Sequence, residues 1–578
     1  MSSRAARRRR LLTRTLPIAL LALAAFVAGI IQGASGTDVS GAQAFADAWA
    51  SQNFRAMYSE ISPSSARQYS LEEFTSDYEK AQTTATVKHV DSGEASDSDS
   101  DGGSAAAVPV TLETHAFGDI QRDLVLPLDS GKVDWAPDLV FPGLRDDERL
   151  VRHTTVPKRA PILAADGTPL AAGPATARSS PIGTAATAIA GSVSTPHHKQ
   201  DDELQRLGFP PAYPTGTSGL ELAFNQRLAG HPGGELVALP AGGGKAATGA
   251  RTLATTDPVP GKPVHTTIDP DLQEAAVAAL GATYGGLAVL DAEDGSVLAV
   301  AGIAFSGPQP PGSTFKLITT TAALEADVVH VDDEFPIQTS TVVEGREIDN
   351  AHSEACGGTF TEAFAESCNS VFAPLGPKVG SNRLVGTAES YGFNSPPTLY
   401  TDSAIKAAGI PSSTLPDRIS SDLDLAVSAI GQGEVLATPL EMASVAQTIA
   451  NGGVREPNSL VTDHSLRADA KPVRVTSSDV TSTLRTLMIG VVTSGTGIAA
   501  ALPGIQVAGK TGTAELGPVT GSRIGAEEQK VDAWFTAFAP ATDPKLAVAA
   551  MVVNASGDGG TVAAPIVRSV MASAFGVG

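Results

Sequence analysis

The heptapeptide PGSTFKL, residues 311–317, places a serine and a lysine three positions apart in ordinary apolar sequence. Residues three apart share a face of a helix, so the hydroxyl of Ser313 and the amine of Lys316 can meet if Ser313 begins one. A serine hydroxyl is a poor nucleophile until a base takes its proton. A lysine acts as that base only where burial or a neighbouring cation lowers its pKa. Taken alone, the pattern also fits an N-capped helix with a solvated lysine.

The composition of the whole chain limits the function classes. A chain of 578 residues is too long for one hydrophobic core, so about two to four domains are expected. Hydrophobic residues make up 42% and charged residues 18%, which is typical of a globular protein. The formal net charge of −22 argues against a nucleic-acid partner, because phosphate recognition needs a basic face.

The N-terminus departs from this acidic composition. A cluster of arginines precedes the apolar run LPIALLALAAFVAGII, residues 16–31. A basic flank before an apolar run indicates an export signal whose arginines stay in the cytoplasm. We expect residues 1–14 to form a cytoplasmic tail and 15–33 an uncleaved single-pass anchor in the cell membrane, with cleavage at residues 34–36 as the alternative. The residues after about 35 would then lie outside the cytoplasm, where no ATP is available.

Three regions follow the apolar run. Residues 38–142 predict a small α+β domain, with helical spacing in SGAQAFADAWASQNFRAMYSEI and alternation in AAAVPVTLETHAF and IQRDLVLPL. Residues 143–262 are rich in Gly, Pro, Thr and Ala and predict an irregular, β-containing domain. In 263–578, PDLQEAAVAAL predicts a helix capped by Asp269, and strand patterns occur at both ends with helices between. This order predicts one antiparallel sheet assembled from both ends of the last domain.

Two short stretches mimic ligand-binding loops. SDSDSDGG, residues 96–103, opens like a calcium loop, but Val108 stands at the twelfth position, where a bidentate Glu is needed. GGGKAAT, residues 242–248, resembles a phosphate loop, but Ala246 replaces the required hydroxyl. Both stretches predict hairpins, and we expect neither a metal nor a cofactor.

The only two cysteines are Cys356 and Cys368. In an exported protein an isolated pair is a disulfide candidate, whereas metal sites need more ligands. The cysteines flank TFTEAFAES, and nine helical residues would separate their ends by about 13 Å. A disulfide needs Cα atoms within about 7 Å, so the chain before Thr359 would have to fold back along the helix. The pair Gly357-Gly358 permits that turn, and two buried free thiols are the alternative.

Two later clusters change the interpretation of PGSTFKL. ESCNSVF contains Ser367-Cys368-Asn369, and AGKTGTAEL contains Lys510-Thr511-Gly512-Thr513 at the start of a strand-like stretch. S-x-x-K followed by S-D-N and K-T-G is the signature of penicillin-binding proteins and class A β-lactamases, although here cysteine replaces the aspartate. The chain resembles a class B (monofunctional) penicillin-binding protein, a serine DD-transpeptidase.

Further stretches support this resemblance. IDNAHSEACGGTFTEAFAESCN, AIGQGEVLATPLEMA and DAWFTAFAP are similar to the same family. GTSGLELAFNQRLAG, residues 216–230, is similar to its dimerisation or pedestal domain, although RAPILAADG, residues 159–167, departs from the segment that often opens it. The first domain resembles the NTF2-like module of the methicillin-resistance type. The implied fold is multidomain α+β: an NTF2-like domain, a β-rich pedestal domain (143–262) and a C-terminal transpeptidase domain of the penicillin-binding/β-lactamase-like fold (263–578), an antiparallel sheet flanked by helices.

The resemblance also implies the roles of the motif residues. The implied catalytic residues are Ser313, Lys316, Ser367 and Lys510, and the implied substrate-binding residues are Asn369, Thr511, Gly512 and Thr513. Ser313, deprotonated by Lys316, would attack the penultimate D-Ala of a peptidoglycan stem peptide. Ser367 would pass the proton to the leaving amine, and the backbone N–H groups of Ser313 and Thr513 would form the oxyanion hole. β-Lactams mimic D-Ala-D-Ala and would acylate the same serine.

The same acyl-serine site would also suit a DD-carboxypeptidase, a β-lactamase or a non-catalytic β-lactam sensor. The first two need an activated water, and no class A deacylation glutamate motif follows Ser367. The family's sensors carry several transmembrane helices, whereas one hydrophobic segment is seen here. The residues before 263 lack a glycosyltransferase signature, so the resemblance implies a SEDS-type membrane glycosyltransferase as partner. We therefore expect a membrane-anchored peptidoglycan DD-transpeptidase; whether it serves elongation, division or sporulation stays open.

Overall fold

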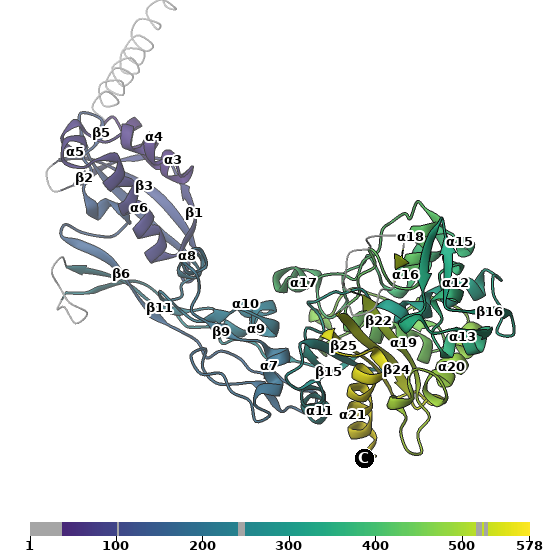
Figure 1. Cartoon of the computed structure of the whole chain (residues 1–578). Helices are drawn as coiled ribbons and strands as arrows, with labels where there is room; N and C mark the ends of the chain where they lie inside the picture. Colours follow the sequence, from purple (N-terminus) through teal and green to yellow (C-terminus); the bar gives the residue numbers. More distant parts are fainter. Residues whose placement is uncertain (1–36, 101–102, 241–248, 516–522, 525–529, 578) are drawn as a thin grey trace, which may run out of the picture. The chain divides into compact units, whose positions relative to one another are not determined.

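The computed structural model describes residues 37–100, 103–240, 249–515, 523–524 and 530–577 (Figure 1). These residues form two compact units. The first unit extends to Pro157 and includes Pro196–Tyr213 and Gly230–Pro260. The second unit consists of Lys158–Thr195, Pro214–Ala229 and the remainder from Gly261. The chain therefore crosses between the units several times, and residues 143–262 contribute to both.

Helices at the start of the first unit pack on an antiparallel sheet. The helices are α3 (Ser40–Ala50), α4 (Phe54–Ser59), α5 (Pro63–Gln68) and α6 (Leu71–Ala85). The strands are β1 (Val87–Ser92), β2 (Ser96–Ser100), β3 (Gly103–Thr114), β4 (Gly118–Asp129) and β5 (Lys132–Val133). The predicted strand pair is confirmed, because β3 and β4 pair from Ala105↔Pro127 to Thr114↔Gly118. The acidic stretch 96–103 is also a hairpin, of β2 with β3, although Asp101 and Gly102 lie outside the described residues.

A second sheet of this unit joins distant parts of the sequence. Its order is β12 (Arg251–Thr256), β11 (Gly233–Pro240), β6 (Glu148–Thr155), and α8 (His198–Arg206) belongs to the same unit. The strands β11 and β12 pair antiparallel on either side of GGGKAAT. That stretch itself, residues 242–248, lies outside the described residues.

The second unit begins with short elements around a buried ion-pair network. They are β7 (Ile162–Leu163), β8 (Pro169–Ala171), α7 (Thr184–Ala190), β9 (Val193–Ser194), β10 (Thr215–Gly216), α9 (Gly219–Ala223), α10 (Asn225–Ala229) and β13 (Val264–His265). Arg159 Nε donates to Glu221 Oε2 at 2.8 Å, and Arg178 Nε donates to Glu221 Oε1 at 2.7 Å. Removing one partner would leave a buried charge uncompensated, so this network holds the short segments together.

The sheet of the second unit has the order β15-β14-β25-β24-β22 (Figure 1). Its strands are β14 (Gly285–Asp291), β15 (Val297–Gly302), β22 (Ala508–Glu515), β24 (Val531–Ala539) and β25 (Leu546–Ala555). All pairs are antiparallel, and β14 from the start of the domain pairs with β25 from its end. The prediction of one antiparallel sheet built from both ends is confirmed.

Helices cover both faces of this sheet because its strands are apolar on both faces. Leu287 and Val289 pack in a cluster with α11 (Pro270–Leu280) and α21 (Ala564–Phe575). Their neighbours Ala288 and Leu290 point to the opposite face, toward α19 (Pro439–Ala450). The predicted cap of α11 is confirmed, since the Asp269 side chain accepts from the backbone N–H of Asp271 and Leu272.

The remaining described α-helices and β-strands lie between β15 and β22 or directly after β22. The helices are α12 (Lys316–Glu325), α13 (Phe360–Ala365), α14 (Asn369–Phe372), α15 (Leu375–Val379), α16 (Ser381–Tyr391), α17 (Asp402–Ala408), α18 (Asp422–Ala429) and α20 (Ser478–Thr493). The strands are β16 (Glu334–Gln338), β17 (Ser340–Val343), β18 (Arg346–Asp349), β19 (Cys356–Thr359), β20 (Val454–Arg455), β21 (Val473–Arg474) and β23 (Arg523–Ile524). Within the described ranges, none of the helices is both long and apolar enough to span a bilayer. The predicted tail (1–14) and anchor (15–33) fall outside those ranges.

Candidate active site

The stretch PGSTFKL lies directly beside strand β22. Residues Gly312–Phe315 form one 3₁₀ turn, and α12 continues from Lys316. Gly312 has φ of +52°, and a Cβ there would lie 2.5 Å from the carbonyl oxygen of Thr513. Only glycine fits this backbone conformation and this close approach. The glycine therefore brings the first motif against the third.

Lys316 is fully buried, and its amine ends at the second motif. Nζ donates to the backbone oxygen of Ser367 and to Asn369 Oδ1, each at 2.7 Å, and lies 3.3 Å from Ser367 Oγ. It also lies 5.1 Å from the centroid of the Phe372 ring. Burial, and next the nearby Lys510 charge, hold the pKa of Lys316 well below its usual range. The amine is thus set up to be neutral at a pH where a surface lysine is charged.

Lys510 approaches the same serine from β22. Its Nζ donates to Ser367 Oγ at 2.7 Å and to the backbone oxygen of Thr511 at 3.1 Å, and it lies over the ring of Phe364. Burial lowers the pKa of Lys510 to about 7. Ser367 Oγ therefore lies within hydrogen-bond distance of both lysine nitrogens. The structure thus brings Lys316 of the first motif, Ser367 of the second and Lys510 of the third together.

Ser367 reaches this place through a left-handed backbone conformation. The helix α13 ends at Ala365 and α14 begins at Asn369, so Ser367 and Cys368 form the connection. Ser367 has φ of +61°. A non-glycine residue in that region costs on the order of 1–3 kcal/mol and persists only where its surroundings impose it. Such strain is concentrated at functional sites, and here it directs the Ser367 side chain toward the two lysines.

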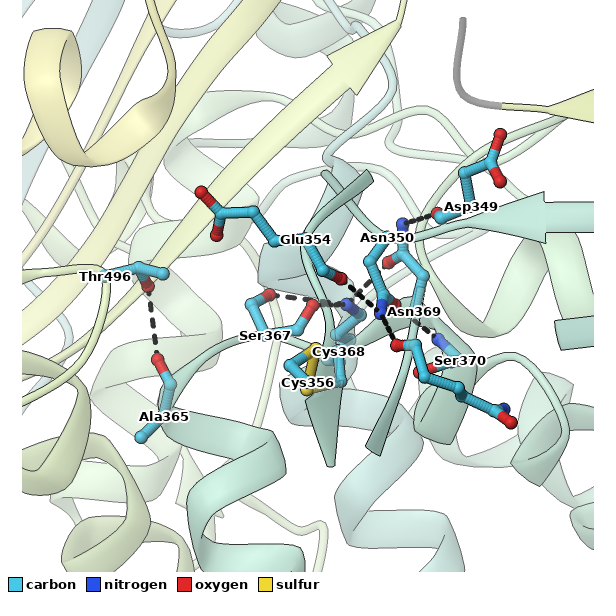
Figure 2. Close-up of a disulfide and its surroundings, with 12 residues drawn as sticks. Asp349, Asn350, Glu354, Cys356, Ala365, Ser367, Cys368, Asn369, Ser370 and Thr496 are labelled. Atoms are coloured by element: carbon cyan, nitrogen blue, oxygen red, sulfur yellow. Dashed lines mark hydrogen bonds between the residues drawn. A yellow bond between two sulfur atoms is a disulfide. The ribbon is translucent and has the colours of Figure 1, made fainter. Parts of the chain in front are cut away.

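Cys356 and Cys368 are joined by a disulfide, with Cα atoms 5.8 Å apart (Figure 2). The chain folds back before Thr359, as such a bond requires: β19 leads from Cys356 to Thr359, and Gly358 has φ of +80°. Thr359 and Glu362 then form a capping box that begins α13. The bond ties Cys368, between Ser367 and Asn369, to the wall of the cleft.

We expect the protein denatured without reductant to contain no free thiol. Replacing both cysteines with alanine should lower the free energy of unfolding by about 2–3 kcal/mol, because the disulfide restricts the unfolded chain over a short loop. A thiol count and denaturant unfolding measure these quantities, with reduced unmodified protein as the control. Two free thiols in the untreated protein would contradict this prediction.

The other motif residues lie around the two lysines. Asn369 accepts from Lys316 through Oδ1 and donates through Nδ2 to the backbone oxygen of Asp349 at 2.9 Å (Figure 2). Thr511 shares a hydrogen bond of 2.6 Å with Thr496, and Thr513 Oγ1 accepts from the N–H of Gly559 at 3.4 Å. A Cβ on Gly512 would lie 2.7 Å from the carbonyl oxygen of Pro311. Glycine is therefore required where β22 passes the first motif.

A cavity of about 630 Å³ opens onto these groups. Five of the predicted catalytic and substrate-binding residues line it: Ser313, Ser367, Asn369, Thr511 and Thr513. Further polar residues of the wall were not predicted from the sequence, among them Asn350, His352, Glu354, Glu362, Glu366, Glu515 and Asp558. Several of them belong to IDNAHSEACGGTFTEAFAESCN, so their nearness to the second motif was the signal that could have found them.

Three protein-family models match the chain in sequence order. The NTF2-like N-terminal transpeptidase domain matches residues 39–148, and the penicillin-binding protein dimerisation domain matches 168–266. The penicillin-binding protein transpeptidase domain matches 285–572 and includes all three motifs.

Named relatives agree with these matches. The chain is 36% identical over 295 residues to the peptidoglycan D,D-transpeptidase PbpA of Mycobacterium tuberculosis, covering 47% of this chain and 56% of the relative. It is 32% identical over 275 residues to the stage V sporulation protein D of Bacillus subtilis, covering 45% of this chain and 41% of the relative. The chain thus spans about half the length of the curated relatives it matches.

Solved structures give the same result. The crystal structure of PBPA from M. tuberculosis is 27% identical, with a TM-score of 0.55, over 72% of this chain and 99% of that one. The penicillin G acyl-enzyme complex of M. tuberculosis penicillin-binding protein A is 28% identical, with a TM-score of 0.56, over 72% of this chain and 100% of that one. With three matched domains in order and three motifs assembled at one cleft, the chain belongs to the class B penicillin-binding proteins that carry an NTF2-like N-terminal domain.

Proposed function

We propose that this chain is a serine D,D-transpeptidase that crosslinks peptidoglycan stem peptides and is acylated by β-lactams. The observation that carries the proposal is the pair of buried lysines that both contact Ser367 Oγ, at a cavity that Ser367 and Ser313 line. Burying two amines costs folding free energy, and buried groups with shifted pKa values at a cleft are characteristic of active sites. The relatives named D,D-transpeptidase support the reaction class.

Lys316 is the base that activates Ser313. A neutral amine has two N–H donors and one lone pair. The two acceptors at 2.7 Å, Ser367 O and Asn369 Oδ1, use both donors. The lone pair is then left to take the hydroxyl proton of Ser313. Ser313 Oγ attacks the carbonyl carbon of the penultimate D-Ala.

Ser367 carries the proton onward to the leaving group. Lys510 donates to Ser367 Oγ, so the Ser367 hydroxyl hydrogen is free to be donated elsewhere. As the C–N bond to the terminal D-Ala breaks, the leaving nitrogen takes the Ser367 proton, and Ser367 recovers one from Lys316. The products of this half-reaction are the acyl ester on Ser313 and free D-Ala, and Lys316 is again neutral.

The strand β22 supplies the binding groups. Lys510, Thr511 and Thr513 hold the terminal carboxylate of the substrate, and Gly512 keeps β22 close to the nucleophile. The backbone N–H groups of Ser313 and Thr513 stabilise the oxyanion, a contribution of about 3–4 kcal/mol per donor. An amine of a neighbouring stem peptide then attacks the ester and forms the crosslink. A β-lactam acylates Ser313 without such release.

Label retention after penicillin acylation tests this proposal. We expect the full-length protein in detergent to bind fluorescent penicillin covalently and keep the label for hours. With a stem peptide, it should release D-Ala only when an amine acceptor is present. Release of the label by water within minutes would indicate a β-lactamase, and release of D-Ala without acceptor a carboxypeptidase. A stable label with no reaction on stem peptides would indicate a sensor.

We also propose that residues 15–33 anchor the protein in the cell membrane with its catalytic domain outside, and that a SEDS-type glycosyltransferase is its partner. The arginine cluster and the apolar run support the anchor. Membrane fractionation with N-terminal sequencing tests it: a soluble chain that begins near Thr37 would contradict the proposal. Copurification from detergent tests the partner.

A further inference from the structure

Asn350 is a buried asparagine whose amide joins three segments of the cleft wall (Figure 2). It is 3% exposed and belongs to the cavity lining. Its Nδ2 donates to the backbone oxygens of Gln338 at 2.8 Å and Glu354 at 3.0 Å. Its Oδ1 accepts from the N–H of Ser370, in the first turn of α14, at 2.8 Å. Both amide hydrogens and the amide oxygen are therefore used within the wall.

The peptide group between Asp349 and Asn350 contacts Asn369. The N–H of Asn350 donates to the carbonyl oxygen of Thr339 at 2.8 Å. The carbonyl oxygen of Asp349, in the same peptide group, accepts from Asn369 Nδ2 at 2.9 Å. A trans peptide is planar, with its N–H and C=O pointing in opposite directions. Holding the N–H against Thr339 therefore aims the carbonyl oxygen at Asn369.

This carbonyl determines which way the Asn369 amide faces. Because Nδ2 must donate to Asp349, Oδ1 is the atom left for Lys316 Nζ, at 2.7 Å. The reversed amide would place two oxygens against each other at Asp349 and two donors against each other at Lys316. The orientation that gives Lys316 its second acceptor is therefore imposed from outside the three motifs.

We infer that Asn350 is a positioning residue for acylation, which holds the Asp349–Asn350 peptide and the start of α14 so that Asn369 orients the Lys316 amine. The inference rests on the proposed function. Asn350 acts through Asn369, so its loss should impair the acylation step and leave binding of the β-lactam carboxylate by β22 intact. A misplacement of about 1 Å in such a site costs up to about 100-fold in rate.

The test is the acylation kinetics of full-length Asn350→Ala and Asn350→Asp with fluorescent penicillin. Asn350→Asp keeps the size of the side chain and the acceptor for Ser370 but loses both donors. We expect the limiting acylation rate per titrated site to fall about 30- to 100-fold in Asn350→Ala, with the dissociation constant of the prior complex within about twofold. The matched control is Asn458→Asp. Asn458 is equally a buried asparagine, whose amide donates to Gly295, but it lies outside the cavity lining, so acylation should not change.

A double-mutant cycle separates positioning from general destabilisation. In an Asn369→Ala background, Asn350→Ala should lower the acylation rate by less than about threefold, because the route through Asn369 is already lost. A fully additive loss would overturn the inference. An unchanged acylation rate in Asn350→Ala would also overturn it. The same holds if the variants have fewer titratable sites but a normal rate per site, or if both variants fail to fold. An unmodified protein that does not label at all would instead reject the proposed function.

Discussion

Replacing Ser313 with alanine abolishes covalent labelling by penicillin, by more than about 1,000-fold, and leaves the unfolding temperature almost unchanged. The acyl bond forms on Ser313 Oγ, in the 3₁₀ turn directly before α12, and alanine provides no nucleophile there. Ser313 is half-buried, and its side chain makes no hydrogen bond within the part of the chain that the structure describes. The substitution therefore removes the nucleophile with a stability change of about 0.5 kcal/mol or less.

Peptide mass spectrometry of the labelled protein identifies the acylated residue. The control is Ser306→Ala, an exposed serine of the same domain whose loss should leave labelling intact. Covalent label in Ser313→Ala at any other serine would contradict the assignment. Loss of label together with a large drop in unfolding temperature would point to misfolding instead.

The sequence alone was sufficient to predict the motifs and the layers of the last domain. S-x-x-K, S-x-N and K-T-G are short local patterns, and the strands β14 and β25 show their burial as continuous apolar runs. The cap of α11 and the β3–β4 pair were predictable for the same reason, since their signals lie within a few residues. These features depend on local chemistry.

Features that depend on contacts between distant residues were not predictable. The strand β6 pairs with β11, which lies some 80 residues later, and neither strand's own pattern shows its partner. Asparagine is common in loops, so the residue type of Asn350 does not reveal its role. That role depends on simultaneous hydrogen bonds of its side chain with Gln338, Glu354 and Ser370. The disulfide remained undecided from the sequence because helical spacing alone sets its cysteines too far apart. The turn before α13 removes that obstacle.

Replacing Lys316 with methionine should lower the acylation rate by about 1,000-fold while the protein stays folded. Methionine has a similar length and suits the apolar contact with Phe372. It provides no base for Ser313, and a general base contributes about 10²- to 10⁴-fold. The measurement is the acylation rate per titrated site at pH 7, with the unfolding temperature as the check on folding. A loss smaller than about tenfold would mean that another group takes the proton.

The pH dependence of acylation in Lys510→Met tests whether Lys316 acts as the base or is only a buried lysine. Lys316 acts only when neutral, so the rate falls as the pH drops through its pKa. The Lys510 charge helps to keep that pKa low. Removing this cation raises the Lys316 pKa, and the acid limb of the profile should therefore move to higher pH.

The unmodified protein should also lose activity above about pH 7, as Lys510 loses its proton, and the variant should lack this limb. The two amines interact, so the limbs report the pair rather than one residue. Relative to the unmodified protein, the variant is thus more impaired at low pH than at high pH, although its overall rate is lower. An acid limb at the same pH in both proteins would show that Lys510 does not set the protonation of Lys316.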